Sequence, residues 1–298
     1  MRSHSVVVFV VAASVALVAG CSTGTSSGAS LSNPESAGPT IASPVSSTPS
    51  LAVATARVTA RPNPMYRPTV SGAFVVTNEG RKLELRCWGE GSPTIILEAG
   101  HPSAGLDQFG TYGRAFTGRL AEQRRTCAYD RAGYGASDPA PMEPRDIDDV
   151  TDDLHALLDE ADLDGPFVLV GASFGGMIVT YYAHRFPDGV RGVVLLDVPA
   201  PSATLTLAEA PQLAWDSPDN PEHTDVIPEF ENRLASERFA FTAPLLVITA
   251  TRGQSSVADQ AFWLDWSSDS RQVELDGEHS VYFDQPVAVA DAIIAMGD

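Results

Sequence analysis

The feature that most constrains this sequence is a serine between glycines, with a strand-like run before it and a helix-like run after it. The apolar run Phe167-Val-Leu-Val170 leads directly into Gly171-Ala-Ser-Phe-Gly175, and the helix-like segment from 177 to 183 follows. A bare G-x-S-x-G occurs by chance as a tight turn, but this context is the one that a nucleophile elbow requires. The turn is so tight that side chains at the glycine positions would clash, and its strain leaves the serine hydroxyl exposed. The pattern predicts Ser173 as a nucleophile.

The elbow lies within a longer alternation of strand-like and helix-like segments. Short apolar runs that end in polar residues are typical of buried strands in a parallel sheet. Between them, apolar residues such as Val150, Leu154 and Leu157 recur on one helical face. We therefore predict a doubly wound α/β fold, with a mostly parallel eight-stranded sheet and helices on both faces. The predicted strands lie at 74–77, 83–87, 94–98, 126–130, 167–170, 193–196, 245–248 and 272–275, the first two forming a hairpin.

The first 69 residues have a different composition from the rest. Residues 1–20 combine Arg2, an apolar run from Val6 to Val18 and small residues, which is the pattern of a signal peptide. Val18-Ala-Gly-Cys21 resembles the lipobox of bacterial lipoproteins, so we expect Cys21 to carry lipid; an ordinary signal peptide with an incidental cysteine is the alternative. Residues 21–69 are rich in Ser, Thr, Pro, Ala and Gly and predict a disordered tether. The catalytic domain is expected at 70–298.

The charge balance limits the partners that this chain can bind. Its 19 basic and 38 acidic residues give a net charge of −19, which argues against nucleic-acid binding. An anionic membrane surface would be repelled too, so membrane association is expected through the lipid anchor. We expect an exported protein held at the extracytoplasmic face of the cell membrane. The acidic run from Asp146 to Asp153 is interpreted as a helix start, because it lacks EF-hand spacing; no metal or organic cofactor is predicted.

A serine nucleophile needs a base and two donors for the oxyanion. His279 is the best candidate base, because it follows the last predicted strand, in the order typical of serine hydrolases with this elbow. The oxyanion donors are expected to be backbone N–H groups of Phe174, after the nucleophile, and of His101, in the loop after the third strand. Pro102 cannot serve because proline has no N–H.

Taken together, these segments resemble α/β hydrolases of the serine esterase, lipase and peroxidase-like type. The resemblance covers residues 72–298, and its parts occur in the order of the family. It implies a serine hydrolase that cleaves an ester bond of a small molecule, as a carboxylesterase does. The matching segments are Glu98-Ala-Gly100, Asp130-Arg-Ala-Gly-Tyr-Gly-Ala-Ser137, Gly171-Ala-Ser-Phe-Gly-Gly176, Val193-Val-Leu-Leu-Asp197, Gly277-Glu-His279 and Asp284-Gln-Pro286.

The resemblance also bears on the acid of the triad. Many relatives place this acid in a G-x-x-D pattern after the seventh strand, where this chain has Ala250-Thr-Arg-Gly253. Two candidates remain in the order serine, acid, histidine. Asp197, at the end of the sixth strand, is preferred because some lipases use that position. Asp259 is the alternative.

Two cysteines besides Cys21 remain. An even pair in an oxidising compartment favours a disulfide between Cys87 and Cys127, provided that the fold lets them meet. In the sheet order of the family their strands are neighbours, which makes the pairing geometrically reasonable. Two buried free thiols are the alternative.

The segment 199–243 interrupts the alternation and is expected to form a cap, with helices near 205–213 and 227–238. Its aromatic residues are candidates either for an apolar pocket wall or for ordinary cap packing. An aminopeptidase or a thioesterase of the same fold is the alternative within enzymes, the former needing cap carboxylates such as Glu222, Glu229 or Glu231. A non-catalytic envelope binding lipoprotein is the alternative outside enzymes, and the retention of both Ser173 and His279 argues against it.

Overall fold

The computed structural model describes residues 67–77 and 79–297. The predicted signal peptide, the lipidation site at Cys21 and nearly all of the predicted tether lie outside these residues. Within the described part of the chain, no helix combines the length and the apolarity that crossing a membrane would need.

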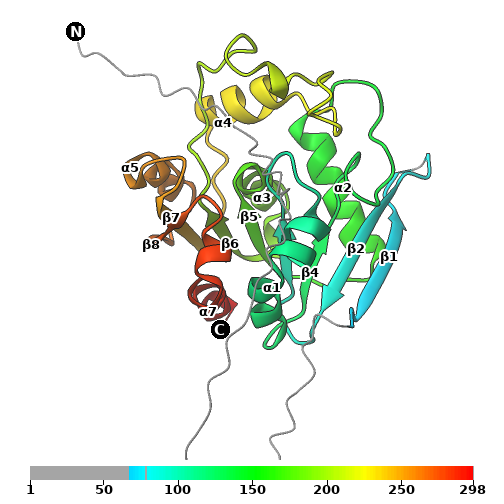
Figure 1. The fold of residues 1–298 in the computed structure, drawn as a ribbon, viewed down its shortest axis with the longest axis vertical. Helices are drawn as coiled ribbons and strands as arrows, with labels where there is room; N and C mark the ends of the chain where they lie inside the picture. Colours follow the sequence, from blue (N-terminus) through cyan, green and yellow to red (C-terminus); the bar gives the residue numbers. More distant parts are fainter. Residues whose placement is uncertain (1–66, 78, 298) are drawn as a thin grey trace, which may run out of the picture. The chain divides into compact units, whose positions relative to one another are not determined.

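The core of the domain is one eight-stranded sheet, as predicted (Figure 1). The strand order is β1-β2-β4-β3-β5-β6-β7-β8. β2 runs antiparallel to both of its neighbours, β1 and β4, and all other neighbouring strands are parallel. The strands are β1 (Val70–Val75), β2 (Lys82–Trp88), β3 (Ile95–Glu98), β4 (Thr126–Tyr129), β5 (Phe167–Ala172), β6 (Val190–Leu196), β7 (Leu245–Arg252) and β8 (Ser270–Glu278).

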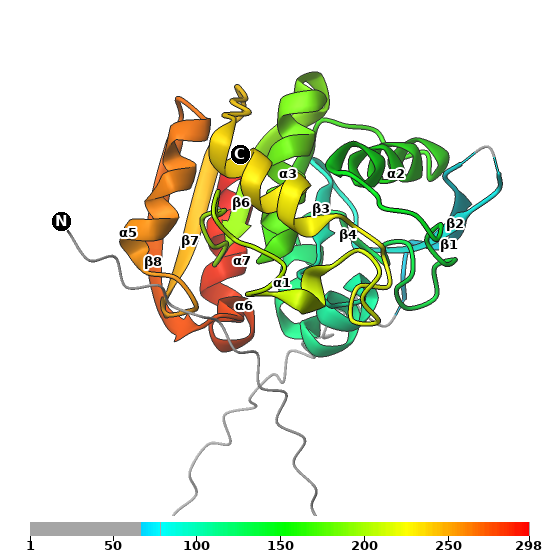
Figure 2. The same cartoon turned by 90° about the horizontal axis from the view of Figure 1, so that it is seen from above.

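Helices cover both faces of the sheet (Figures 1 and 2). Side chains of successive strand residues point to opposite faces, so Ile96 of β3 packs into one apolar cluster and its neighbours Ile95 and Leu97 into the other. The first cluster includes α2 (Ile147–Glu160), α3 (Phe174–Arg185) and η6 (Ala261–Trp266). The second includes η2 (Leu106–Tyr112), α1 (Arg114–Ala121), α6 (Val281–Asp284) and α7 (Pro286–Gly297). Outside the cap, η3 (Pro187–Gly189) and α5 (Val257–Gln260) are further short helices. Two isolated bridges join the cap to other segments, Arg145 to Thr224 and Phe241 to Ser267.

The acidic run from Asp146 to Asp153 forms the N-cap and the first turns of α2. The Asp146 carboxylate accepts a hydrogen bond from the Asp149 N–H, and the Asp149 carboxylate accepts one from the Asp146 N–H. This reciprocal cap satisfies two backbone donors that a helix start leaves unpaired. Farther along α2, Asp153 forms ion pairs with Arg81 and Arg145.

The cap differs in part from its prediction. The second predicted helix is present as η5 (Val226–Asn232) and α4 (Arg233–Ser236), but the first is wrong: 205–210 forms turns, followed only by the short η4 (Pro211–Leu213). The exposed Leu207 gives this segment little apolar area to bury. Thr206 instead donates backbone and side-chain hydrogen bonds to the Glu209 carboxylate, which stabilises a local turn.

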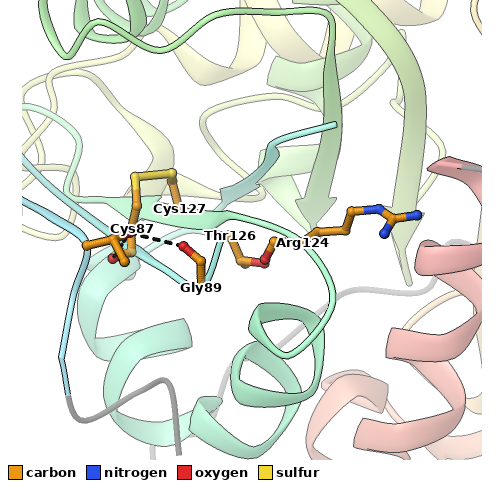
Figure 3. Close-up of a disulfide and its surroundings, with 6 residues drawn as sticks. Cys87, Gly89, Arg124, Thr126 and Cys127 are labelled. Carbon is orange, nitrogen blue, oxygen red and sulfur yellow. Dashed lines mark hydrogen bonds between the residues drawn. A yellow bond between two sulfur atoms is a disulfide. The ribbon is translucent and has the colours of Figure 1, made fainter. Parts of the chain in front are cut away.

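Cys87 and Cys127 lie directly opposite each other on β2 and β4, and their sulfur atoms are bonded (Figure 3). Both side chains are fully buried. The bond closes a loop over a sequence separation of 40 residues, which on the chain-entropy account stabilises the fold by roughly 4 kcal/mol. On the outer side of β2, Thr69 donates to the carbonyl oxygen of Cys87 and thereby extends the β1 edge.

Candidate active site

Ser173 occupies a strained turn between β5 and α3. Its backbone has φ 50° and ψ −125°, a conformation that non-glycine residues rarely adopt and that functional sites often retain. The turn also brings the start of α3 close to the loop after β3: a Cβ added at Gly175 would lie 2.5 Å from the carbonyl oxygen of Ala99. Only glycine permits this approach, so the close packing of the two segments explains why the motif has glycine at position 175.

A cavity of about 360 Å³ opens beside Ser173. His279, which follows β8, lines the same cavity, as do the loop from Gly100 to Ala104 and the side chains of Tyr112 and Phe283. Asp107 is the one acidic residue in the lining, and the lining includes no lysine or arginine. The lining comes from the loop after β3, η2, the elbow, and the residues from His279 into α6; it includes no residue of the cap.

His279 is held by a buried carboxylate. Its Nδ1 lies 2.7 Å from Oδ2 of Asp197, which follows β6 with a positive φ of 47°. Asp197 is 1% exposed. A carboxylate at Nδ1 fixes the imidazole with the proton on Nδ1 and leaves Nε2 free to accept a proton.

Asp259, the alternative acid, makes different contacts. It lies in α5, where its carboxylate accepts a hydrogen bond from the Ser256 hydroxyl at 2.7 Å. The Ser256 oxygen in turn accepts from the Asp259 N–H, which caps the helix start. The structure thus brings Asp197 to His279 and leaves Asp259 in a local cap.

The loop with His101 lies against the elbow. The Gly100 N–H donates to Oε1 of Gln108, whose Nε2 donates to the Tyr282 hydroxyl. The His101–Pro102 peptide is cis. His101 Nδ1 lies 3.0 Å from the Tyr134 hydroxyl; burial, helped by the nearby Arg131 guanidinium, lowers the pKa of the imidazole to about 4. At neutral pH the His101 ring is therefore an uncharged wall of the cavity.

Arg131 supports the same loop from behind. Its guanidinium donates to the carbonyl oxygens of Ala99 and Gly100 at 2.7 and 3.3 Å. It also pairs with Glu98 at 2.7 Å and with Glu222 of the cap at 2.9 Å, all three side chains being buried. Burial raises the pKa of the Glu98 carboxyl, against the opposing effect of Arg131. A buried pair of this kind is costly to break, since each charge would lose its partner, so Arg131 ties the cap to the loop.

The cap aromatics that were candidates for a pocket wall do not line the cavity. Phe230, Phe239 and Phe241 are buried in the apolar cluster, and Trp215 contacts His223. Within the described part of the chain, no group of three or more His, Cys, Asp and Glu side chains is arranged to hold a metal ion.

Comparison with known proteins agrees with this geometry. The sequence profile of a family described as alpha/beta hydrolase fold matches residues 93–235. A thermophilic esterase from Thermogutta terrifontis superposes with a TM-score of 0.64 at 18% identity, covering 76% of this chain and 99% of that one. An enol-lactonase from Burkholderia xenovorans gives 0.60 at 20% identity, covering 75% and 98%. The chain has the α/β-hydrolase fold.

Curated relatives of this protein match shorter segments. It is 28% identical over 172 residues to the bifunctional esterase/perhydrolase DCH of Acinetobacter calcoaceticus, covering 56% of either chain. It is 30% identical over 127 residues to the cis-3-alkyl-4-alkyloxetan-2-one decarboxylase of Shewanella oneidensis, covering 42% of this chain and 38% of that one. Because the match spans little more than half of these relatives at most, it supports the hydrolase fold and leaves substrate and activity to be argued from the site.

Three residues that contact this site or its buried carboxylate have no clear signal in the sequence: Arg131, Gln108 and Gln260, whose Nε2 donates to Asp197. Arg131 lies in a segment that matches the family, but no pattern indicates that its partners are Glu222 and two carbonyl oxygens. Gln108 and Gln260 belong to no motif, because each follows an aspartate in an ordinary helical segment and its partners are distant in the sequence.

Proposed function

We propose that this protein is a serine hydrolase that cleaves an ester or related acyl bond through an acyl-enzyme on Ser173. The observation that carries the proposal is the coincidence of Ser173 and His279 in one cavity, with His279 Nδ1 2.7 Å from the buried Asp197 carboxylate. Hydrolase-fold neighbours that include an esterase and a lactonase support the reaction class.

The chemistry follows from these groups. His279 Nε2 takes the proton of the Ser173 hydroxyl as its Oγ attacks the acyl carbon, and Asp197 stabilises the imidazolium that forms. The negative charge moves to the former carbonyl oxygen, which the N–H groups of His101 and Phe174 receive. The C–O bond to the leaving alcohol breaks as His279 returns the proton to that oxygen. Water then attacks the acyl-enzyme with the same base, and releases the acid.

The cavity favours an uncharged ester. A carboxylate-bearing substrate would meet Asp107 with no lysine or arginine in the lining to offset the repulsion. The aminopeptidase alternative gains no support, because the cap carboxylates are engaged elsewhere: Glu222 pairs with Arg131, Glu229 with Arg233, and Glu231 accepts from the Ser202 N–H.

Covalent labelling by a fluorophosphonate probe tests the proposal. We expect the wild-type protein to be labelled, Ser173→Ala to lose labelling, and Ser280→Ala to keep it, since Ser280 is another serine of the same cavity. Hydrolysis of p-nitrophenyl acetate should follow the same order. A folded wild-type protein that neither labels nor hydrolyses esters would contradict the proposal and favour a binding module.

We further propose export and lipid attachment at Cys21, followed by tethering of the hydrolase to the membrane through residues 21–69. The lipobox-like Val18-Ala-Gly-Cys21 motivates this proposal, and the bonded Cys87 and Cys127 are consistent with an oxidising compartment. Expression in a bacterial host should give a membrane-bound form with a diacylglyceryl mass increment, and Cys21→Ser should release the protein. A wild-type protein without that increment would refute lipid attachment.

A further inference from the structure

The Asp197 carboxylate is surrounded by hydrogen-bond donors. Its Oδ1 accepts from Gln260 Nε2 at 2.6 Å and from the Ala250 N–H at 3.1 Å. Its Oδ2, which faces His279, also accepts from the Gln254 N–H at 3.4 Å. Gln260 is the side-chain donor among these three, the other two being backbone N–H groups, and its side chain is fully buried.

The orientation of the Gln260 amide is fixed by a second hydrogen bond. Thr249 Oγ1 lies 2.9 Å from Gln260 Oε1 and also accepts from Gln272 Nε2 at 2.9 Å. Because that oxygen accepts from Gln272, the Thr249 hydroxyl is free to donate its proton to Gln260 Oε1. The Gln260 NH₂ group is then directed at Asp197, and an ionised carboxylate can only accept. The two contacts require the same amide orientation.

We propose that Gln260 is a positioning residue for the acid of the triad, acting through Asp197 on His279; this inference rests on the proposed serine hydrolase function. Gln260 holds Oδ1 so that Oδ2 stays directed at His279 Nδ1. It stabilises the negative charge with a neutral donor, which adds no competing charge to the buried site. The relay from Gln272 through Thr249 keeps the amide in its donating orientation.

Two variants separate positioning from packing. Gln260→Leu keeps most of the side-chain volume and removes the donor, so kcat should fall about 10- to 100-fold with little change in KM. Gln260→Glu places a carboxyl beside Asp197, and two such groups in one site share a proton until the pH exceeds their raised upper pKa. The shared proton replaces the amide hydrogen at low pH and is lost at high pH.

The pH profile is therefore the decisive readout. Among the described contacts, Gln260 meets one charged group, Asp197, which in turn meets His279. With the full-length protein and p-nitrophenyl acetate, the ratio of Gln260→Glu activity to wild-type activity should approach one at low pH and fall as the pH rises. The corresponding ratio for Gln260→Leu should stay low at every pH. Circular dichroism verifies that each variant is folded.

Each alternative result is distinct. If both variants keep wild-type activity, Gln260 has no role in positioning. If both are slow with flat ratios across pH, a proton shared with Asp197 does not replace the amide, and the proposed action through Asp197 is wrong. Thr249→Val and Thr249→Ser provide an independent check outside the contact with Asp197: the valine variant should lose several-fold in kcat and the serine variant should retain it. A wild-type protein with no esterase activity and no fluorophosphonate labelling would instead contradict the proposed function itself.

Discussion

The ends of β6 and β7 lie side by side, but only β6 is followed by a buried carboxylate. β6 is followed by Asp197, whose buried carboxylate faces His279. β7 ends in Ala250-Thr-Arg252 and is followed by Gly253; this segment has no carboxylate and contributes the Ala250 N–H to Asp197. A Cβ added at Gly253 would lie 2.3 Å from Asp197 Oδ2. The Asp197 carboxylate therefore occupies the space that a side chain at position 253 would need.

This difference teaches that one carboxylate site is shared by two strand ends. Neighbouring parallel strands bring their carboxyl ends to the same edge of a sheet, and β6 and β7 are joined by the hydrogen bond from the Asp197 N–H to the Ile248 carbonyl oxygen. In this structure the carboxylate follows β6, and a side chain at position 253 would overlap it. The predictions below test this relation, from the largest expected effect to the smallest.

Removal of the carboxylate should have the largest effect. Asp197→Ala takes away the group that fixes and stabilises the His279 imidazole, so kcat/KM for p-nitrophenyl acetate should fall about 10³- to 10⁴-fold. Initial rates at pH 7.5 measure this. A loss below tenfold would show that another group orients His279 and would break the comparison.

A side chain at position 253 should reduce activity nearly as much, and removal of the Asp197 carboxylate should restore part of that activity. Gly253→Asp alone should lower kcat/KM about 100-fold, because its side chain collides with Asp197. In the double variant Asp197→Ala, Gly253→Asp the space is free, and activity should rise at least tenfold above that of Asp197→Ala. Gly253→Ser combined with Asp197→Ala is the control, because serine occupies the space without a negative charge. Equal rates for the two double variants would contradict the shared site.

Glu231 of the cap is a partly buried carboxylate with fewer donors than Asp197, and its effect should be on stability. Burial, against one hydrogen bond from the Ser202 N–H, raises the pKa of Glu231 from 4.5 to about 7. A raised pKa in the folded protein means that stability is lost as the pH rises from 4.5 through 7. The change in the free energy of unfolding caused by Glu231→Gln should therefore be more favourable at pH 8 than at pH 5, by on the order of 2 kcal/mol.

Urea unfolding at the two pH values measures this difference. Glu229→Gln is the matched control, because Glu229 lies in the same element η5 and pairs with Arg233. If Glu231→Gln changes the free energy of unfolding equally at pH 5 and pH 8, the carboxyl does not titrate in this range.

Asp259, two positions from the start of α5, should matter least. Its carboxylate bonds to Ser256 and has no contact with His279 in the described structure, so Asp259→Asn should change kcat/KM less than twofold and cost at most about 1 kcal/mol of stability through the weaker cap. Parallel rate measurements with Asp197→Ala decide between the two candidate acids. A loss comparable to that of Asp197→Ala would reverse the assignment.

Much of the fold could be predicted because its signals are local. The elbow at Ser173 needs only a strand, two glycines and a helix in sequence, and each buried strand shows its own apolar run. The first cap helix was mispredicted because Leu207 stays exposed and Glu209 stabilises a local turn, which the sequence alone does not reveal. The cavity wall was similarly undecided, since an aromatic residue has the same sequence signal in a pocket and in a core.

The sequence by itself determined the strand and helix alternation, the strained serine turn and the late histidine, because these depend on residues adjacent along the chain. Only the tertiary structure brought Asp197 rather than Asp259 to His279, joined Arg131 to Glu222, and placed Gln260 against Asp197. Those contacts unite residues 82, 91 and 63 positions apart. Their geometry depends on strand order and helix packing, which bring distant side chains within hydrogen-bonding distance.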